Sequence, residues 1–304
     1  MNLFSTSSTA TTRARRSHHP VLLLALTGIA VSLCAAYAHA ADNRKEIKLD
    51  VAPGGNVNIV NAAGSVTLYA APGRQVVISY TTHSDKVEVD QGASASKGRL
   101  ELRTHALAGQ KPTAEEARVD YDIAVPAGIS VNVNTVSAPI TADGLSGDIT
   151  LSSETGQLVV RNASKSHIQT RSMTAPVTLS NVTNAKVDIH SSGGAVKLEN
   201  VSGPRVTVGT GSGNIDYRGD CSGGGDYIMT THSGAIDMVL PPTASVDLTA
   251  RSNSGSVENE FPLQEKTHHS FVPQQGRSFA GTSNSGSSSV ELQSFSGKIR
   301  VKKQ

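Results

Sequence analysis

A short repeat of apolar residues runs along the chain from residue 131 and constrains its fold more than any other feature. Within each unit two apolar residues stand two places apart, as in Val131/Val133 and Val187/Ile189. A period of two predicts a strand with one buried face. The half-step between units is nine residues and the full repeat is 18–21 residues. The first apolar members are Val131, Ile140, Ile149, Leu158, Ile168, Val177, Val187, Val196, Val206, Ile215, Tyr227 and Ile236.

A repeat of this length is typical of a solenoid, in which each coil buries its apolar face only against neighbouring coils. Turns rich in Ser, Thr, Asn and Gly separate the strands, and Gly supplies positive φ where a turn needs it. Before residue 131 the alternation continues with looser spacing. We therefore predict an all-β protein, a single-domain parallel β-solenoid (β-helix) over residues 41–304 with 18–21 residues per coil.

Two polar segments interrupt this pattern. Residues 106–118 and 261–282 lack the apolar alternation, and we expect both to be surface excursions from the coils. The strands nearest the two ends of the sequence carry outward charges. We expect these charges to lie at the ends of the stack and to oppose edge-to-edge polymerisation, which favours a monomer. They are Lys48 and Asp50 near one end, and Lys298, Arg300 and Lys302 near the other.

The first forty residues have the features of a secretory signal peptide. Arg13, Arg15 and Arg16 form a basic region, an apolar run spans residues 21–36, and Ala38-His39-Ala40 is a cleavage motif. This pattern predicts an exported protein, located in the periplasm or on the cell surface. Removal of residues 1–40 leaves 24 basic against 25 acidic residues, a net charge of about −1. That balance argues against a nucleic-acid partner, and no later apolar run is long enough to span a membrane.

A polar residue recurs in one turn at intervals of nineteen. The spacing would stack these side chains about 4.8 Å apart on successive coils, where we expect them to bond turn backbone as a structural ladder. The members are Asp143, Asn162, Asn181 and Asn200.

Asp216, Asp237 and Glu258 form a second series, spaced at twenty-one residues. On successive coils the three carboxylates would stack within about 5 Å, which is destabilising unless a cation bridges them. Bound Ca²⁺ would supply that charge. The alternative is a solvated acidic stripe, which the absence of the glycine-rich repeat of calcium β-rolls favours.

Catalytic residues are not evident in this sequence. Asp216, Asp237 and Glu258 are the only acidic cluster on one strand face, and they lack the acid–base asymmetry that polysaccharide hydrolysis requires. We therefore predict a protein that is not an enzyme and that needs no cofactor. A polysaccharide-active enzyme is the less favoured alternative.

Several short segments resemble the DUF4097 family of bacterial adhesin-like domains, and the likeness extends over essentially all of residues 45–301. The segments are Asn61–Leu68, Ser212–Ile215, Ser233–Ile236, Leu240–Val246, Glu260–Leu263, Ser285-Gly286, Val290–Leu292 and Ser296–Val301. The resemblance implies an exported parallel β-solenoid and supplies no catalytic residues to carry over. We expect a non-catalytic binding or structural module of the cell envelope, with an envelope protein or a surface glycan as partner. A periplasmic partner in envelope-stress signalling is the alternative.

Overall fold

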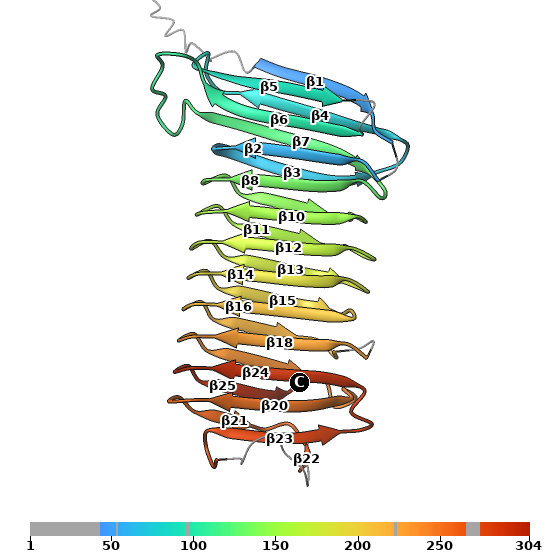
Figure 1. The fold of residues 1–304 in the computed structure, drawn as a ribbon, viewed down its shortest axis with the longest axis vertical. Helices are drawn as coiled ribbons and strands as arrows, with labels where there is room; N and C mark the ends of the chain where they lie inside the picture. The colour runs from blue at the N-terminus through green and yellow to red at the C-terminus, as the bar shows by residue number, and fades with distance from the viewer. Residues whose placement is uncertain (1–42, 53, 95–97, 222–223, 266–273) are drawn as a thin grey trace, which may run out of the picture. The chain divides into compact units, whose positions relative to one another are not determined.

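The computed structural model describes residues 43–52, 54–94, 98–221, 224–265 and 274–304, which belong to one compact unit. The predicted signal peptide lies outside the described residues. All regular elements in the described ranges are β-strands, arranged in two facing sheets that run the length of the stack (Figure 1). Most strand pairs are parallel, and this confirms the prediction of an all-β parallel solenoid. The described residues contain no helix that is long and apolar enough to cross a bilayer.

Sheet A has twelve strands. Their spatial order is β1 (Asn43–Asp50), β4 (Gln75–Thr82), β7 (Arg118–Pro126), β3 (Ala63–Ala71), β9 (Ile140–Asp143), β11 (Leu158–Arg161), β13 (Val177–Val182), β15 (Val196–Val201), β17 (Ile215–Arg218), β19 (Ile236–Leu240), β25 (Ile299–Lys303) and β21 (Val257–Asn259).

Sheet B has thirteen strands. Their spatial order is β22 (Gln264–Glu265), β23 (Ser278–Ser283), β20 (Val246–Ser252), β24 (Ser288–Ser294), β18 (Asp226–Thr231), β16 (Arg205–Thr210), β14 (Lys186–Ser191), β12 (His167–Ser172), β10 (Asp148–Ser153), β8 (Ser130–Thr135), β2 (Asn56–Asn61), β6 (Arg99–Ala106) and β5 (Val87–Ser94).

Between β8 and β19 each coil contributes one strand to each sheet and pairs with the next coil in the sequence. Ile149 stands beside Ile168, and Ile168 beside Val187, in the register that the nineteen-residue repeat predicts. Both residues of each apolar pair, such as Val187 and Ile189, point between the sheets and are fully buried. Each coil therefore shares its core with two neighbours, as a solenoid requires.

The turns from sheet B to sheet A depend on a buried hydroxyl and, in most coils, a close glycine. In one coil the Ser191 Oγ donates to the Gly194 carbonyl oxygen at 3.0 Å. A Cβ atom on Gly194 would lie 1.9 Å from the carbonyl oxygen of Ala175 in the preceding coil. Only glycine fits this approach at position 194, whereas in two other coils the same hydroxyl bond is made to an alanine, Ala138 or Ala175.

The C-terminal coil lies inside the stack, and the expectation that Lys298, Arg300 and Lys302 mark its end is wrong. Strand β24 lies between β18 and β20, and β25 lies between β19 and β21. The segment 261–282 is correspondingly more than a loop, since it includes β22 and most of β23. Strand β23 pairs antiparallel with β20 and covers that edge of sheet B. After the last coil, β20 and β21, the chain returns and places β24 between β18 and β20. Val290 and Leu292 of β24 therefore have neighbours in both adjacent strands.

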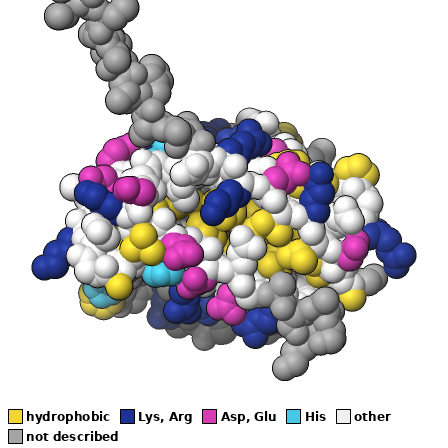
Figure 2. Space-filling model, turned by 90° about the horizontal axis from the view of Figure 1, so that it is seen from above, with side chains coloured by type: hydrophobic (Ala, Val, Ile, Leu, Met, Phe, Trp, Pro, Cys, Tyr) yellow, Lys and Arg dark blue, Asp and Glu magenta, His cyan; other side chains and the backbone are white. Residues whose placement is uncertain are grey.

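The N-terminal end shows the same departure from sequence order. The coil of β2 and β3 lies between the coil of β6 and β7 and that of β8 and β9, and antiparallel strands β1, β4 and β5 complete this end. A reciprocal pair of hydrogen bonds stabilises one turn within the excursion between β6 and β7. The Thr113 N–H donates to Glu116 Oε2 at 2.9 Å, and the Glu116 N–H donates to Thr113 Oγ1 at 3.3 Å. Figure 2 views this end, where yellow apolar side chains gather in the middle of a charged rim.

Candidate functional site

A groove follows the corner of the stack where the strands of sheet B end and the turns toward sheet A begin. We call it the corner groove. It consists of two adjoining hollows of about 510 and 440 Å³ that share Thr210 and Thr230. The lining residues are Arg171, Ser172, His190, Ser191, Ser192, Gly209, Thr210, Thr230, Thr231, His232, Arg251, Asn253, Gln293, Ser294 and Phe295.

One register row forms the wall of this groove on the outer face of sheet B. Its members come from six neighbouring strands and lie side by side in pairs: Arg171, His190, Gly209, Thr230, Gln293 and Arg251. Five strand spacings of about 4.8 Å give the row a length of about 24 Å. The two arginines therefore stand at opposite ends of an extended polar surface.

Gly209 creates the depression in the middle of the row. The imidazole ring of His190 lies beside it, with Nδ1 3.5 Å from the place that a Cβ of residue 209 would occupy. This is an ordinary van der Waals contact, so the backbone would accept a side chain here. The hollow is open because this position in the row has no side chain.

Phe295 and His232 form a flat surface at the edge of the groove, on the adjacent turns. Their ring centroids are 4.8 Å apart and the rings are parallel to within 3°. Phe295 is 50% exposed, one of a few large apolar side chains on the surface of the described chain. The stacked pair thus offers an exposed aromatic face beside polar groups.

The groove has a basic character. Its lining includes two arginines and two histidines, and none of the described lining residues is acidic. Two acidic side chains of sheet B, Asp188 and Glu291, stand two positions from members of the row and have hydrogen-bonding partners. Asp188 lies 3.1 Å from His167 Nε2 and 3.8 Å from Lys186 Nζ, and Glu291 accepts a hydrogen bond from Gln293. An anionic ligand would therefore meet donors in the lining, although Glu291 keeps its negative charge two positions from Gln293 on the same strand.

Sequence reasoning did not find this groove. The signal lies in the repeated Ser-Gly units, where His232 precedes Ser233-Gly234 and Phe295 precedes Ser296-Gly297. The two residues are 63 positions apart, and they stack only because β24 lies beside β18. Sequence order alone places a different coil next to β18.

The acidic series Asp216, Asp237 and Glu258 does not stack as the sequence spacing suggested. Asp216 and Asp237 are neighbours, but Arg300 of the inserted β25 stands between Asp237 and Glu258. The Arg300 guanidinium donates to both carboxylate oxygens of Asp237, and Lys298 Nζ lies 2.6 Å from Glu258 Oε1. Asp237 and Glu258 are therefore paired with basic side chains of the protein, and no group of three or more candidate metal ligands occurs among the described residues.

Asp216 remains next to Asp237, and the two carboxylates repel each other. Partial burial and the neighbouring charge of Asp237 raise the pKa of the Asp216 carboxyl, while Arg218, Lys197 and Arg300 act in the opposite direction. The net rise indicates that the negative charge of Asp216 is mildly unfavourable in the folded protein.

Asp143, Asn162, Asn181 and Asn200 form a chain of side-chain hydrogen bonds, where bonding to turn backbone was expected. Each asparagine amide donates to the preceding member, at 2.8, 3.4 and 3.3 Å in chain order. The three asparagines have φ near +53°, a left-handed conformation that asparagine adopts more readily than most residues. The row has a structural explanation in both its backbone and its side chains.

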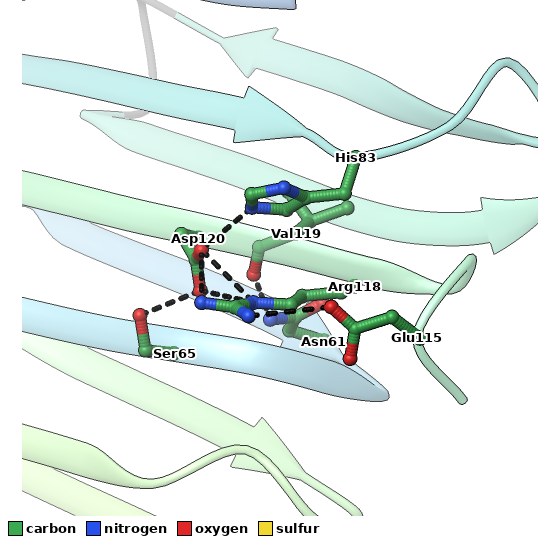
Figure 3. Close-up of polar contacts among 7 residues, drawn as sticks. All are labelled: Asn61, Ser65, His83, Glu115, Arg118, Val119 and Asp120. Carbon is green, nitrogen blue, oxygen red and sulfur yellow. Dashed lines mark hydrogen bonds and ion pairs between the residues drawn. The ribbon is translucent and has the colours of Figure 1, made fainter. Parts of the chain in front are cut away.

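A compact polar cluster near the N-terminal end contains serine, histidine and aspartate, but in an arrangement that does not activate a nucleophile (Figure 3). Asp120 accepts hydrogen bonds from Ser65 on one oxygen, at 2.8 Å, and lies 2.7 Å from His83 Nε2 on the other. Arg118 Nε also donates to Asp120, at 3.1 Å. The carboxylate separates the serine from the histidine, whereas nucleophilic catalysis needs the histidine next to the serine.

The Asp120 cluster instead joins β3, β7 and the end of β4. Burial acts to raise the pKa of Asp120, but the hydrogen bonds from Ser65, His83 and Arg118 outweigh it, and the net pKa lies below the ordinary value. The ionised carboxylate therefore stabilises the folded N-terminal end.

Cys221 is buried and has no features of a reactive thiol. Burial raises its pKa to about 12, so the thiolate is scarce at neutral pH.

The chain is similar to one known protein family and, in part, to two solved structures. The model of the Toastrack DUF4097 family matches residues 46–302. No curated protein sequence matches the chain. Two crystal structures are similar in part, those of a candidate cell adhesion protein from Clostridium sporogenes and a candidate adhesin from Bacteroides fragilis. The first is 12% identical and covers 86% of this chain and 100% of its own, with a TM-score of 0.30. The second is 11% identical and covers 87% and 99%, with a TM-score of 0.44.

Both scores lie below 0.5, so neither likeness supports an argument about function. The family match stands on its own, because it spans nearly all of the described coils, from β1 to β25. It also confirms the resemblance predicted from the short Ser-Gly and Asn-Ala segments. The chain belongs to the Toastrack DUF4097 family.

Proposed function

We propose that this protein is an exported, non-catalytic, adhesin-like module of the bacterial cell envelope that binds its partner through the corner groove. The groove carries the proposal, because it joins exposed arginine, histidine, hydroxyl, amide and aromatic groups on one surface. Export is supported by the signal-like residues 1–40.

The lining favours binding over hydrolysis. Glycoside hydrolysis ordinarily uses two carboxylates that flank the scissile bond, about 5–10 Å apart. The described lining of the groove carries no carboxylate, and the Asp120 cluster lacks a serine–histidine contact. The groove is thus suited to holding a ligand on a rigid scaffold.

The first test is binding of the protein, residues 41–304, to envelopes isolated from the native bacterium. We expect saturable binding that falls at least tenfold in a Phe295→Ala, Arg251→Ala double variant. Arg161→Ala removes an exposed arginine of sheet A, away from the groove, and serves as the matched control. Equal binding by the double variant and the control would overturn the assignment of the groove.

The second test is protease accessibility of the protein on intact cells, with lysed cells as the control. Cleavage on intact cells supports a role in adhesion at the surface. Protection until lysis supports the periplasmic alternative, in which the partner is an envelope protein. Retention in the cytoplasm, with residues 1–40 uncleaved, would contradict export.

A further inference from the structure

We propose that the ligand of the corner groove is an acidic glycan, a sugar polymer that carries carboxylate or phosphate groups. This inference rests on the proposed binding function and names the ligand class of the same groove. It follows from the charges, the aromatic face and the length of the groove, which are independent of one another.

The charges define the acidic part of the ligand. Arg171 and Arg251 stand at opposite ends of the row, both exposed, and within the described part of the chain neither is engaged by a carboxylate. Guanidinium groups bind carboxylate and phosphate through paired hydrogen bonds. His190 and His232 lie between them and add further donors. Acidic groups at intervals along a chain would engage both ends.

The remaining lining defines the sugar part. A sugar ring has an apolar C–H face and a rim of hydroxyl groups. The exposed ring of Phe295, held parallel to His232, offers an apolar face for such a ring. Thr230, Asn253 and Gln293 place hydroxyl and amide groups beside it. These side chains both donate and accept hydrogen bonds, as sugar hydroxyls do.

The shape of the groove favours an extended polymer. The row runs about 24 Å along the stack, since six strands contribute to it at about 4.8 Å each. Both hollows are open to solvent, and they meet at Thr210 and Thr230. A compact metabolite would contact only one hollow, whereas a chain of sugars would lie across both.

The test measures binding of residues 41–304 to defined polymers by isothermal titration calorimetry. The probes are polygalacturonate, its fully methyl-esterified form, phosphorylated dextran, unmodified dextran and polyglutamate. We expect binding to polygalacturonate, to phosphorylated dextran or to both, and at least tenfold weaker binding to the neutral forms. The first two probes distinguish carboxylate from phosphate as the acidic group.

Three groove variants separate the contributions. Arg251→Ala removes a charge at one end, and we expect at least a tenfold loss with a weaker dependence on ionic strength. Phe295→Ala removes the aromatic face, and we expect a loss without a change in that dependence. Gly209→Thr fills the hollow with a side chain that the backbone accepts, and we expect it to block binding. Arg161→Ala is the control, and thermal unfolding of each variant verifies its fold.

Three outcomes would overturn the inference. Equal binding by Gly209→Thr and wild type would exclude the groove. Polyglutamate binding as tightly as the acidic glycans would show that the groove selects charge alone. Binding to native envelopes without binding to any acidic glycan would remove this ligand class and leave the proposed binding function in place. Failure to bind envelopes as well would overturn both.

Discussion

Between β8 and β19 each coil pairs with the next coil in the sequence, whereas at both ends a coil from elsewhere in the chain lies between two sequence neighbours. The regular middle repeats one design, with an apolar pair inside and a turn in which a Ser or Thr hydroxyl is followed three residues later by Gly or Ala. The ends add antiparallel strands, such as β23 on β20 and β4 on β7. The local alternation of apolar residues therefore determines the individual coils. Contacts between residues far apart in the sequence determine the two ends of the stack and the corner groove.

Removal of the inserted coil should have the largest effect. A chain truncated after Gly286 lacks β24 and β25, so β20 loses its parallel neighbour and β18 its next coil. We expect amide hydrogen exchange to show lost protection in β20 to β23, with protection retained in β10 to β16, since repeat stability depends on adjacent coils.

A chain that lacks only Lys303 and Gln304, whose side chains are exposed, is the matched control for this truncation, and we expect its protection in β20 to β23 to equal that of the wild type. Retained protection of β20 to β23 in the long truncation would contradict the role assigned to the inserted coil.

In the middle of the stack, a pair of adjacent glycines gives the next largest effect. Gly194→Ala places a Cβ 1.9 Å from the Ala175 oxygen, whereas Gly193→Ala meets only ordinary contacts at 3.5 Å or more. We expect the first change to lower the free energy of unfolding by about 2–3 kcal/mol, as overpacking does, and the second by less than about 0.5 kcal/mol. Urea unfolding measures both. Similar values for the two variants would show that coil spacing adjusts freely.

At the N-terminal end, Asp120 predicts sensitivity to acid. Its folded-state pKa is lowered, so its stabilising contribution is present above about pH 4 and is lost as the pH falls through the lowered pKa. We expect Asp120→Asn to cost about 1 kcal/mol at pH 7 and to cost less as the pH drops below 4. Unfolding by urea at pH 7 and at pH 3 compares the two proteins. A cost that is independent of pH would show that the charge of Asp120 does not matter.

Where the middle meets the inserted coil, Asp216→Asn should have the smallest effect, and of opposite sign. Its pKa is raised, so the charged form is unfavourable in the folded state. We expect the substitution to raise the melting temperature slightly at pH 7. Asp216 is exposed, so solvent screens the repulsion and limits the gain in the free energy of unfolding to about a few tenths of a kcal/mol. The gain should vanish below about pH 4, where the carboxyl is protonated in both states. A loss of stability at pH 7 would mean that Asp216 forms a favourable contact.

The sequence predicts the regular middle of the stack well and the order of coils at its ends poorly. The apolar pairs, such as Val187 and Ile189, fixed both the strands and their buried faces, because a period of two is a local property of the chain. The row from Asp143 to Asn200 was recognisable for the same reason. The order of coils was not, because Ser233-Gly234 and Ser296-Gly297 have the same local pattern and do not reveal which coil lies next to which.

The missed groove and the misread acidic series share one cause. Phe295 reaches His232, and Arg300 reaches Asp237, only when β24 and β25 enter between coils that are consecutive in sequence. A spacing of twenty-one residues correctly paired Asp216 with Asp237 and failed at Glu258. Periodicity predicts neighbours only while the chain winds without interruption.

The most direct test of this account is disulfide formation between paired cysteines across the inserted strand. The structure pairs Ile228 with Glu291 and Glu291 with Thr249, which leaves Ile228 and Thr249 two strands apart. We expect Ile228→Cys/Glu291→Cys to form an intramolecular disulfide on mild oxidation, and Ile228→Cys/Thr249→Cys to form none, since disulfides need Cα atoms within about 7 Å. Buried Cys221 stays in both variants as a common background. A disulfide in the second variant and not in the first would place β20 next to β18 and contradict both the coil order and the groove built on it.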